Sequence, residues 1–194
     1  RVLGLPAAQN QQLKGQWSIL SASFVAMLLI GLLSRWLMPD IHPLILVAST
    51  GASIILVFVL PSSPVSQPYP LLMGQLISAL IGVSCAYLPF GLTINAAIAV
   101  SSCLFFMFLL NCIHPPGGAT AMMPVIVGAP AVGGFNYVIY PVMANMLVLV
   151  ILGVLFHYRW LKQDYPSKPS AEHDDLHKHK DASPLVRLGI AKSD

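Results

Sequence analysis

The stretch NCIHPPGGATAMMP, residues Asn111 to Pro124, decides how the rest of the chain can fold. It lies inside a long apolar region, yet it holds two consecutive prolines and two consecutive glycines. Proline lacks the backbone N–H that a helix interior needs, and glycine weakens a helix. A continuous helix therefore does not run through this stretch, and a histidine, His114, stands at the break.

Charged residues are few and unevenly placed. Of the 194 residues, 9% are charged and 56% are hydrophobic, whereas a soluble domain carries about 25% charged residues. No Asp, Glu, Lys or Arg occurs between Ile41 and Tyr158. A water-soluble fold with such uncharged apolar faces would aggregate. The composition therefore predicts an integral membrane protein.

Several apolar stretches have the length of a membrane helix, which needs about 20 residues to cross a hydrocarbon core of about 30 Å. We predict an all-α polytopic membrane protein, with a cytoplasmic segment at 1–16 and a transmembrane domain at 17–160. Ala119–Val127 is apolar too, but it is short and contains Pro124. The five longer stretches are Trp17–Trp36, Leu44–Leu60, Leu71–Leu88, Leu92–Leu110 and Val138–Phe156.

Short motifs recur along the chain in the same order. IHP occurs at 41–43 and 113–115, and YP occurs at 69–70 and 140–141. TGAS at 50–53 resembles GGAT at 117–120. Similar spacing of several motifs predicts an internal duplication. The expected repeats cover residues 17–88 and 92–158, with three membrane segments in each.

The direction of the second repeat depends on the short segment. If it crosses the membrane with help from its flanks, the chain has six segments and the two repeats are inverted, as in many transporters. If it is re-entrant, the repeats are not simply inverted. Lys14, Arg159 and Lys162 flank the outermost spans, and the positive-inside rule then places both ends in the cytoplasm. This favours six crossings, although Arg35 opposes it.

The break itself predicts a binding site. Irregular backbone in a membrane survives only where protein or water covers it, so the break must face the bundle interior or a cavity. A helix starting near Ala119 would expose unpaired N–H groups that attract an anion. The expected site comprises the break and the matching segment of the first repeat: His114, Gly117, Gly118, Ala119, Thr120, Asn111, His42, Ser49, Thr50 and Ser53.

The absence of charged residues from the membrane region limits the kinds of substrate that the protein could carry. Transporters of metal cations and proton pumps usually carry carboxylates inside the membrane, and none is present here. A small anion, or a polar neutral solute, fits better. His42 and His114 either cap helix ends or take part in proton coupling, and two histidines alone make a poor metal site. We expect no metal and no cofactor.

Other classes of function find little support. No carboxylate pair, ligand cluster or Ser–His–Asp arrangement indicates an enzyme, and no basic stripe indicates nucleic-acid binding. Residues 161–194 are polar and proline-containing, which predicts a flexible cytoplasmic tail. Its histidines, His173, His177 and His179, are spaced irregularly, as in a solvated tail rather than a metal site.

The motif HPPGGATA, His114 to Ala121, resembles the signature of the HPP family of small integral membrane proteins. The resemblance covers roughly Trp17 to Tyr158 and includes the earlier IHP and TGAS motifs. It implies a multi-span membrane protein, and members in cyanobacteria and plastids are linked to nitrite transport. The roles of the family's site residues are not carried over beyond the HPPGGAT positions.

The leading hypothesis is a transporter or channel for a small inorganic anion, nitrite first, in a bacterial cytoplasmic (inner) membrane. The anion would meet Gly117 to Thr120, with Ser49 to Ser53 opposite. Its partners would be the anion and the lipid bilayer, and the glycine-containing helices favour a homo-oligomer. The alternative is a non-transporting scaffold or sensor, in which the centre is dry and Gly118 touches a neighbouring helix.

Overall fold

The computed structural model describes residues 13–41 and 43–167, and the regular structure in them is helical. The predicted all-α class is confirmed. Short 3₁₀-helices, η1 and η2, lie between longer ones, while π-helical turns, η3 and η4, flank α6. The elements are α1 (Leu13–Leu37), α2 (Pro43–Val59), η1 (Pro64–Ser66), α3 (Pro68–Ala86), α4 (Leu92–Leu109), α5 (Gly117–Val127), η2 (Pro130–Val132), η3 (Val138–Met143), α6 (Ala144–Phe156) and η4 (His157–Leu161).

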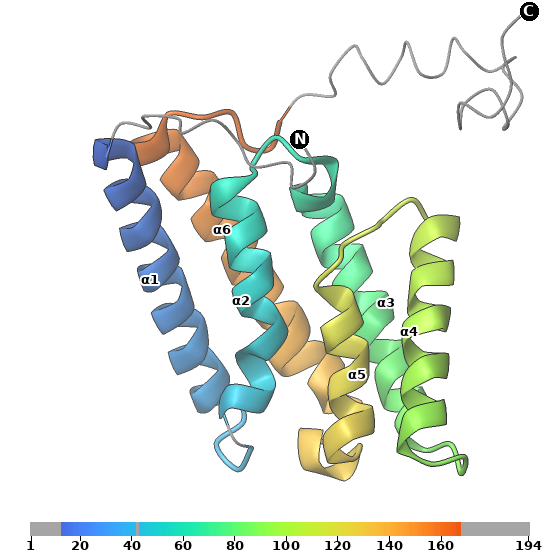
Figure 1. Ribbon diagram of the computed structural model, residues 1–194. Helices are drawn as coiled ribbons and strands as arrows, with labels where there is room; N and C mark the ends of the chain where they lie inside the picture. The colour runs from blue at the N-terminus through green and yellow to red at the C-terminus, as the bar shows by residue number, and fades with distance from the viewer. Residues whose placement is uncertain (1–12, 42, 168–194) are drawn as a thin grey trace, which may run out of the picture.

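The six α-helices run in alternating directions along the bundle (Figure 1). Helices α1, α2 and α6 contact one another, as do α3, α4 and α5, and the two groups meet where α3 contacts α6 and α2 contacts α5. The start of α1 and the end of η4 lie at the same end of the bundle, which is the upper end in Figure 1. We call it the terminus end, because both described chain ends lie there.

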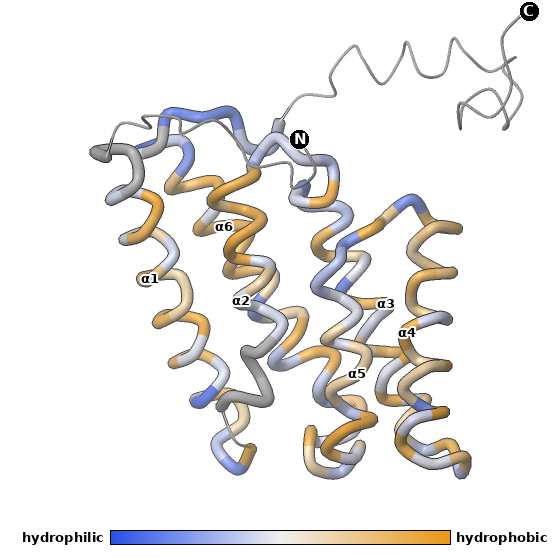
Figure 2. Tube along the Cα trace, viewed as in Figure 1, coloured by the Kyte–Doolittle hydropathy of each residue, from blue (hydrophilic) through white to orange (hydrophobic). Residues whose placement is uncertain are grey.

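Within the described residues, four apolar helical stretches are long enough to cross a membrane: Trp17–Leu37, Pro68–Ala86, Leu92–Leu109 and Val138–Trp160. They match four of the five predicted spans. The described part of α2 and the whole of α5 are apolar but shorter. Hydrophobic residues dominate the helices along the whole bundle (Figure 2). The arrangement as six crossings in two inverted repeats stays a prediction.

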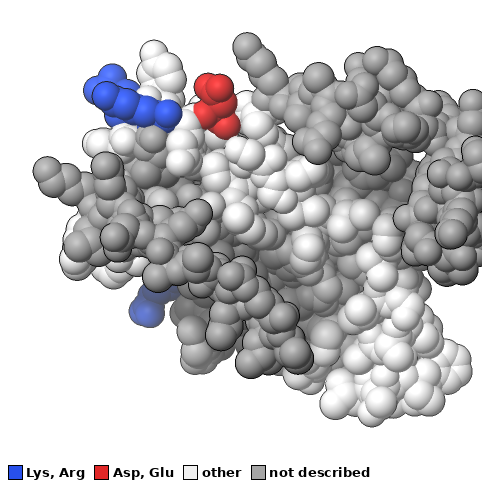
Figure 3. Space-filling view, turned by 45° about the horizontal axis from the view of Figure 1, so that its top comes forward, with Lys and Arg blue, Asp and Glu red and all other residues white. Residues whose placement is uncertain are grey.

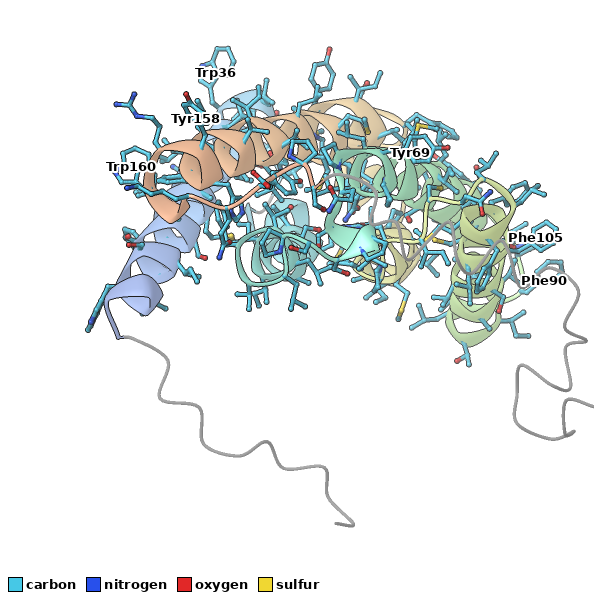
Figure 4. All side chains as sticks on the ribbon, turned by 90° about the horizontal axis from the view of Figure 1, so that it is seen from above. Trp36, Tyr69, Phe90, Phe105, Tyr158 and Trp160 are labelled. Atoms are coloured by element: carbon cyan, nitrogen blue, oxygen red, sulfur yellow. The ribbon has the colours of Figure 1, made fainter. Side chains whose placement is uncertain are left out.

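The outer surface suits lipid along its length. Lys, Arg, Asp and Glu occupy only small patches of the described surface in Figure 3, which turns the terminus end forward. Aromatic side chains point outward instead (Figure 4). Trp and Tyr favour the boundary between membrane and water. The labelled and exposed ones are Trp36, Tyr69, Phe90, Phe105, Tyr158 and Trp160.

Small residues spaced by four along α3 bring other backbones very close. A Cβ atom placed on Gly82 would lie 2.8 Å from the Cα of Ala121 in α5. A Cβ on Gly74 would lie 2.8 Å from the carbonyl oxygen of Cys112. Ser78 lies between the two glycines and is fully buried. Such spacing lets membrane helices pack backbone to backbone, and it fixes α5 and the residues before it against α3.

Candidate functional site

The break predicted from the sequence is present. Helix α4 ends at Leu109 and α5 begins at Gly117, each slightly earlier than expected. Asn111 has a positive φ of 51°, which turns the chain sharply at the terminus end. The residues between the two helices then re-enter the bundle beside α3, so that α5 starts well inside it (Figure 1).

The backbone at the start of α5 is not a free anion site. The N–H of Gly117 donates to the His114 carbonyl at 2.9 Å, and that of Gly118 to the Pro115 carbonyl at 3.1 Å. The N–H of Thr120 donates to the Pro116 carbonyl at 3.3 Å. The two prolines bring no N–H of their own. The prediction of unpaired N–H groups here is therefore wrong, because the preceding turn already accepts them.

Side chains provide the polar groups at the break instead. Four side chains are fully buried: Ser53 of α2, Gln75 of α3, His114 in the segment before α5, and Thr120 of α5. Ser49 of α2 is half-buried beside them. We call these five residues the polar cluster. None of the five is an acid or a strong base, so the cluster concentrates hydrogen-bonding groups without a fixed charge.

His114 is held through both ring nitrogens. Its Nδ1 lies 2.8 Å from the carbonyl oxygen of Val65, and its Nε2 lies 2.9 Å from the hydroxyl of Ser53. A carbonyl only accepts hydrogen bonds, so Nδ1 carries the proton of the neutral ring. Nε2 then presents a lone pair, and the Ser53 hydroxyl donates to it.

Gln75 links the two halves of the cluster. Its amide nitrogen donates to the Ser53 hydroxyl at 3.3 Å, and its amide oxygen accepts from the Thr120 hydroxyl. Since that donation uses the only hydroxyl proton of Thr120, the Ser49 hydroxyl at 2.7 Å must donate to Thr120. The hydrogen bonds therefore form one directed row, in the order Ser49, Thr120, Gln75, Ser53, His114 and the Val65 carbonyl.

The structure brings together residues from both predicted halves of the site. Ser49 and Ser53, from the first TGAS-like segment, contact Thr120 and His114 from the second. Thr50 is buried next to them in α2. The sequence placed these two segments opposite each other, and they lie opposite each other in the bundle.

Other predicted site residues lie elsewhere. Asn111 is exposed at the turn after α4, and Ala119 is exposed on α5. Gly117 packs against Ser78 and Met107, whereas the position of a Cβ on Gly118 has no atom within 4 Å. His42 lies outside the described residues, as do the tail histidines.

Gln75 and Val65 were missed by sequence reasoning. A glutamine inside an otherwise apolar span is costly in a membrane unless a partner satisfies it, so Gln75 itself was a signal. The spacing of Gly74, Ser78 and Gly82 was a second signal, because it marks the face of α3 that meets the break. No signal pointed to the Val65 carbonyl, since any loop residue offers one.

Alanine at two adjacent glycines should give different results. Gly118→Ala should leave the melting temperature unchanged or slightly raised, because the space around it is open. Gly117→Ala should lower stability by about 1–3 kcal/mol, as overpacking does. The added methyl meets the Ser78 hydroxyl, which is bonded to the Gly74 carbonyl at 2.6 Å. Thermal unfolding of both variants in detergent measures this, and equal melting temperatures would contradict the packing.

A hollow of about 450 Å³ lies at the end opposite the termini. The residues of the polar cluster do not line it, so this hollow gives no direct access to them. It is lined by Leu37, Met38, Pro39, Asp40, Ile41, Pro130, Ala131, Gly133, Asn136 and Tyr140. Within the described residues, no three His, Cys, Asp or Glu side chains converge as metal ligands.

Comparison with known proteins also indicates a transmembrane protein. Residues 8–166 match the family model for the transmembrane region of HPP proteins. One transmembrane protein of Dictyostelium discoideum is 31% identical over 149 residues, covering 75% of this chain and 52% of the relative. Another from the same organism is 33% identical over 154 residues, covering 77% and 49%. The chain thus spans about half the length of these curated relatives, and no solved structure matches it.

Proposed function

Because this chain belongs to the HPP transmembrane family and is an integral membrane protein, we propose that it moves a small inorganic anion across the bilayer. Nitrite is the first candidate, as the family resemblance implies. The polar cluster is the proposed site. The role proposed is transport rather than catalysis.

The observation that carries this proposal is the composition of the polar cluster. Four of its five side chains are fully buried in a bundle of apolar helices, where each polar group is costly unless it is paired or used. Its hydroxyl, amide and imidazole groups can turn their N–H and O–H groups toward an anion. A site without a fixed charge would bind such an anion weakly enough to release it.

The helix directions support a transporter plan. Helices α1 to α3 and α4 to α6 run in opposite senses (Figure 1). We propose that α5 and the residues before it together make the fifth of six crossings, so that the two halves form inverted repeats. Helices α2 and α5, which occupy matching places in the halves, meet at the Ser49–Thr120 hydrogen bond. Inverted-repeat transporters bind their substrates where such elements meet.

The position of the positively charged residues supports one orientation of the protein in the membrane. Arg159 and Lys162 are exposed at the terminus end, and the positive-inside rule would place that end in the cytoplasm. A bacterial cytoplasmic membrane remains the proposed location.

Nitrite uptake into proteoliposomes tests the proposal. The unmodified protein should take up nitrite, and His114→Ala and Ser53→Ala should each slow uptake about tenfold, the effect of losing one hydrogen bond of about 1.4 kcal/mol to the anion. Ser84→Ala is the matched control, because Ser84 is exposed on α3 and bonds only the Leu80 carbonyl of its own helix. Absence of uptake by the unmodified protein would rule out nitrite. Uptake unchanged in both variants would rule out the site.

The second candidate function is a non-transporting scaffold or sensor. It is favoured by one observation, namely that the polar groups of the cluster bond one another and the break packs tightly at Gly117. The scaffold hypothesis predicts that Gly118 touches a neighbouring helix, but a Cβ placed on Gly118 would have no atom within 4 Å. The uptake assay separates the two candidates, because a scaffold leaves nitrite outside the vesicles.

A further inference from the structure

A loop that contacts the polar cluster at the terminus end is bonded in turn to a second segment. We propose that residues 61–67, between α2 and α3, form a gate over the cluster, and that residues 162–167, after η4, are the latch that keeps this gate closed. We call them the gate loop and the latch. The inference rests on the proposed function, because a gate needs a site to close.

The gate loop is attached directly to the site. Its Val65 carbonyl accepts the hydrogen bond from Nδ1 of His114 at 2.8 Å. The loop is also a compact unit, because the Gln67 amide nitrogen lies within hydrogen-bond distance of two of its carbonyls, that of Pro61 at 2.8 Å and that of Ser63 at 3.0 Å. Moving it away would leave the His114 N–H without its acceptor.

The latch binds the gate loop through several hydrogen bonds. The Tyr165 hydroxyl donates to the Ser66 carbonyl at 3.0 Å. The backbone N–H of Ser167 donates to the Gln67 amide oxygen at 3.0 Å, and the Ser167 hydroxyl lies 2.7 Å from the Gln67 amide nitrogen, whose two N–H groups it shares with the Pro61 and Ser63 carbonyls. Two adjacent carbonyls of the gate loop therefore accept hydrogen bonds from different sides. The carbonyl of Val65 accepts from His114 in the site, and that of Ser66 accepts from Tyr165 in the latch.

The latch is seated in a prepared place on the bundle. Tyr165 is 6% exposed, and its ring lies 5.2 Å from the ring of His157 in η4. A Cβ on Gly153 of α6 would lie 3.0 Å from the Tyr165 ring, so glycine makes room for it there. Figure 1 shows the chain after η4 running back across the terminus end. This placement is a packed contact rather than a loose extension.

The closed gate carries a cost that opening would remove. The Ser66 hydroxyl is buried and has no hydrogen-bond partner among the residues that the structure describes. A buried polar atom without a partner destabilises the arrangement that buries it, and water would satisfy it once the gate loop lifts. Opening would also free the Nδ1–H of His114, a donor for an anion arriving from the terminus end. The hydrogen bonds of the latch therefore offset the cost of burying the Ser66 hydroxyl in the closed state. Release of the latch would leave the His114 N–H free to bind an anion.

Loosening the latch should expose His114 without any substrate present. Tyr165→Phe keeps the ring but removes its hydrogen bond to Ser66, and Ser167→Ala removes the latch hydroxyl that the Gln67 amide nitrogen contacts. Tyr158→Phe is the matched control, since Tyr158 is 78% exposed at the same end. In the full chain in lipid nanodiscs, hydrogen exchange of the gate loop should become about threefold faster in the first two variants only. Modification of His114 by diethylpyrocarbonate, located by mass spectrometry, should rise in parallel.

Each outcome decides the inference separately from nitrite transport. Unchanged exchange of the gate loop in correctly folded Tyr165→Phe and Ser167→Ala would overturn the latch. Faster exchange with unchanged modification of His114 would overturn the gate. If Tyr165→Phe fails to fold, Ser167→Ala carries the same test. Failed nitrite uptake together with faster exchange and modification would refute the substrate but support the gate.

Discussion

Gly82→Leu is expected to prevent the chain from reaching its folded state. A Cβ on Gly82 would lie 2.8 Å from the Cα of Ala121 and 2.9 Å from its carbonyl carbon. Backbone atoms cannot rotate away as a side chain can, so α3 and α5 would have to separate. The cost should reach about 3 kcal/mol or more, the upper part of the overpacking range. Since α5 carries Thr120, separation would also dismantle the polar cluster.

The yield of monodisperse protein after size-exclusion chromatography, together with the melting temperature, measures this effect. Gly31→Leu is the matched control, because a Cβ on Gly31 of α1 has no atom within 4 Å. It should purify and melt like the unmodified protein. A Gly82→Leu variant of normal yield and melting temperature would show that α3 and α5 do not pack as described.

Gln75→Leu is expected to have the second largest effect, on stability and on uptake together. Leucine has a similar size but none of the amide groups, so Ser53 loses a donor and Thr120 loses an acceptor. Both hydroxyls are fully buried. Leaving such groups unsatisfied should cost about 2 kcal/mol, because hydrogen bonds between membrane helices are individually modest.

Uptake by Gln75→Leu should fall below about a tenth of the normal rate, which corresponds to 1.4 kcal/mol or more in the transition state. Thr93→Val, a polar-to-apolar change at an exposed position of α4, should change neither quantity. Normal stability of Gln75→Leu would contradict the directed row. Normal stability with lost uptake would instead indicate that Gln75 binds the substrate and does not stabilise the fold.

Several elements of the fold could be predicted because their causes are local. Prolines and glycines after His114 forbid a continuous helix, so the break was visible in the sequence. The apolar runs gave the four long spans, because membrane thickness sets their length. The repeated motifs also indicated that Ser49 and Ser53 would face His114 and Thr120, as they do.

The rest depends on contacts between distant parts of the chain. Whether the N–H groups of Gly117 and Gly118 were free depended on a turn formed by the carbonyls of His114 and Pro115. Tyr165 belongs to a segment whose composition indicated a flexible tail, yet it packs inside the terminus end through η4 and α6. No local sequence pattern predicts that this segment folds back and packs against the bundle.

The directed row of hydrogen bonds has a wider consequence. Its protons can be arranged in two ways, because a flip of the Gln75 amide and a tautomer change of His114 would reverse every bond except that to the Val65 carbonyl, which would be lost. Only the arrangement with a proton on Nδ1 matches the Val65 carbonyl. One backbone oxygen in a surface loop therefore selects between two collective states of three helices. Lifting that loop would therefore remove the constraint on the proton arrangement without the movement of any helix.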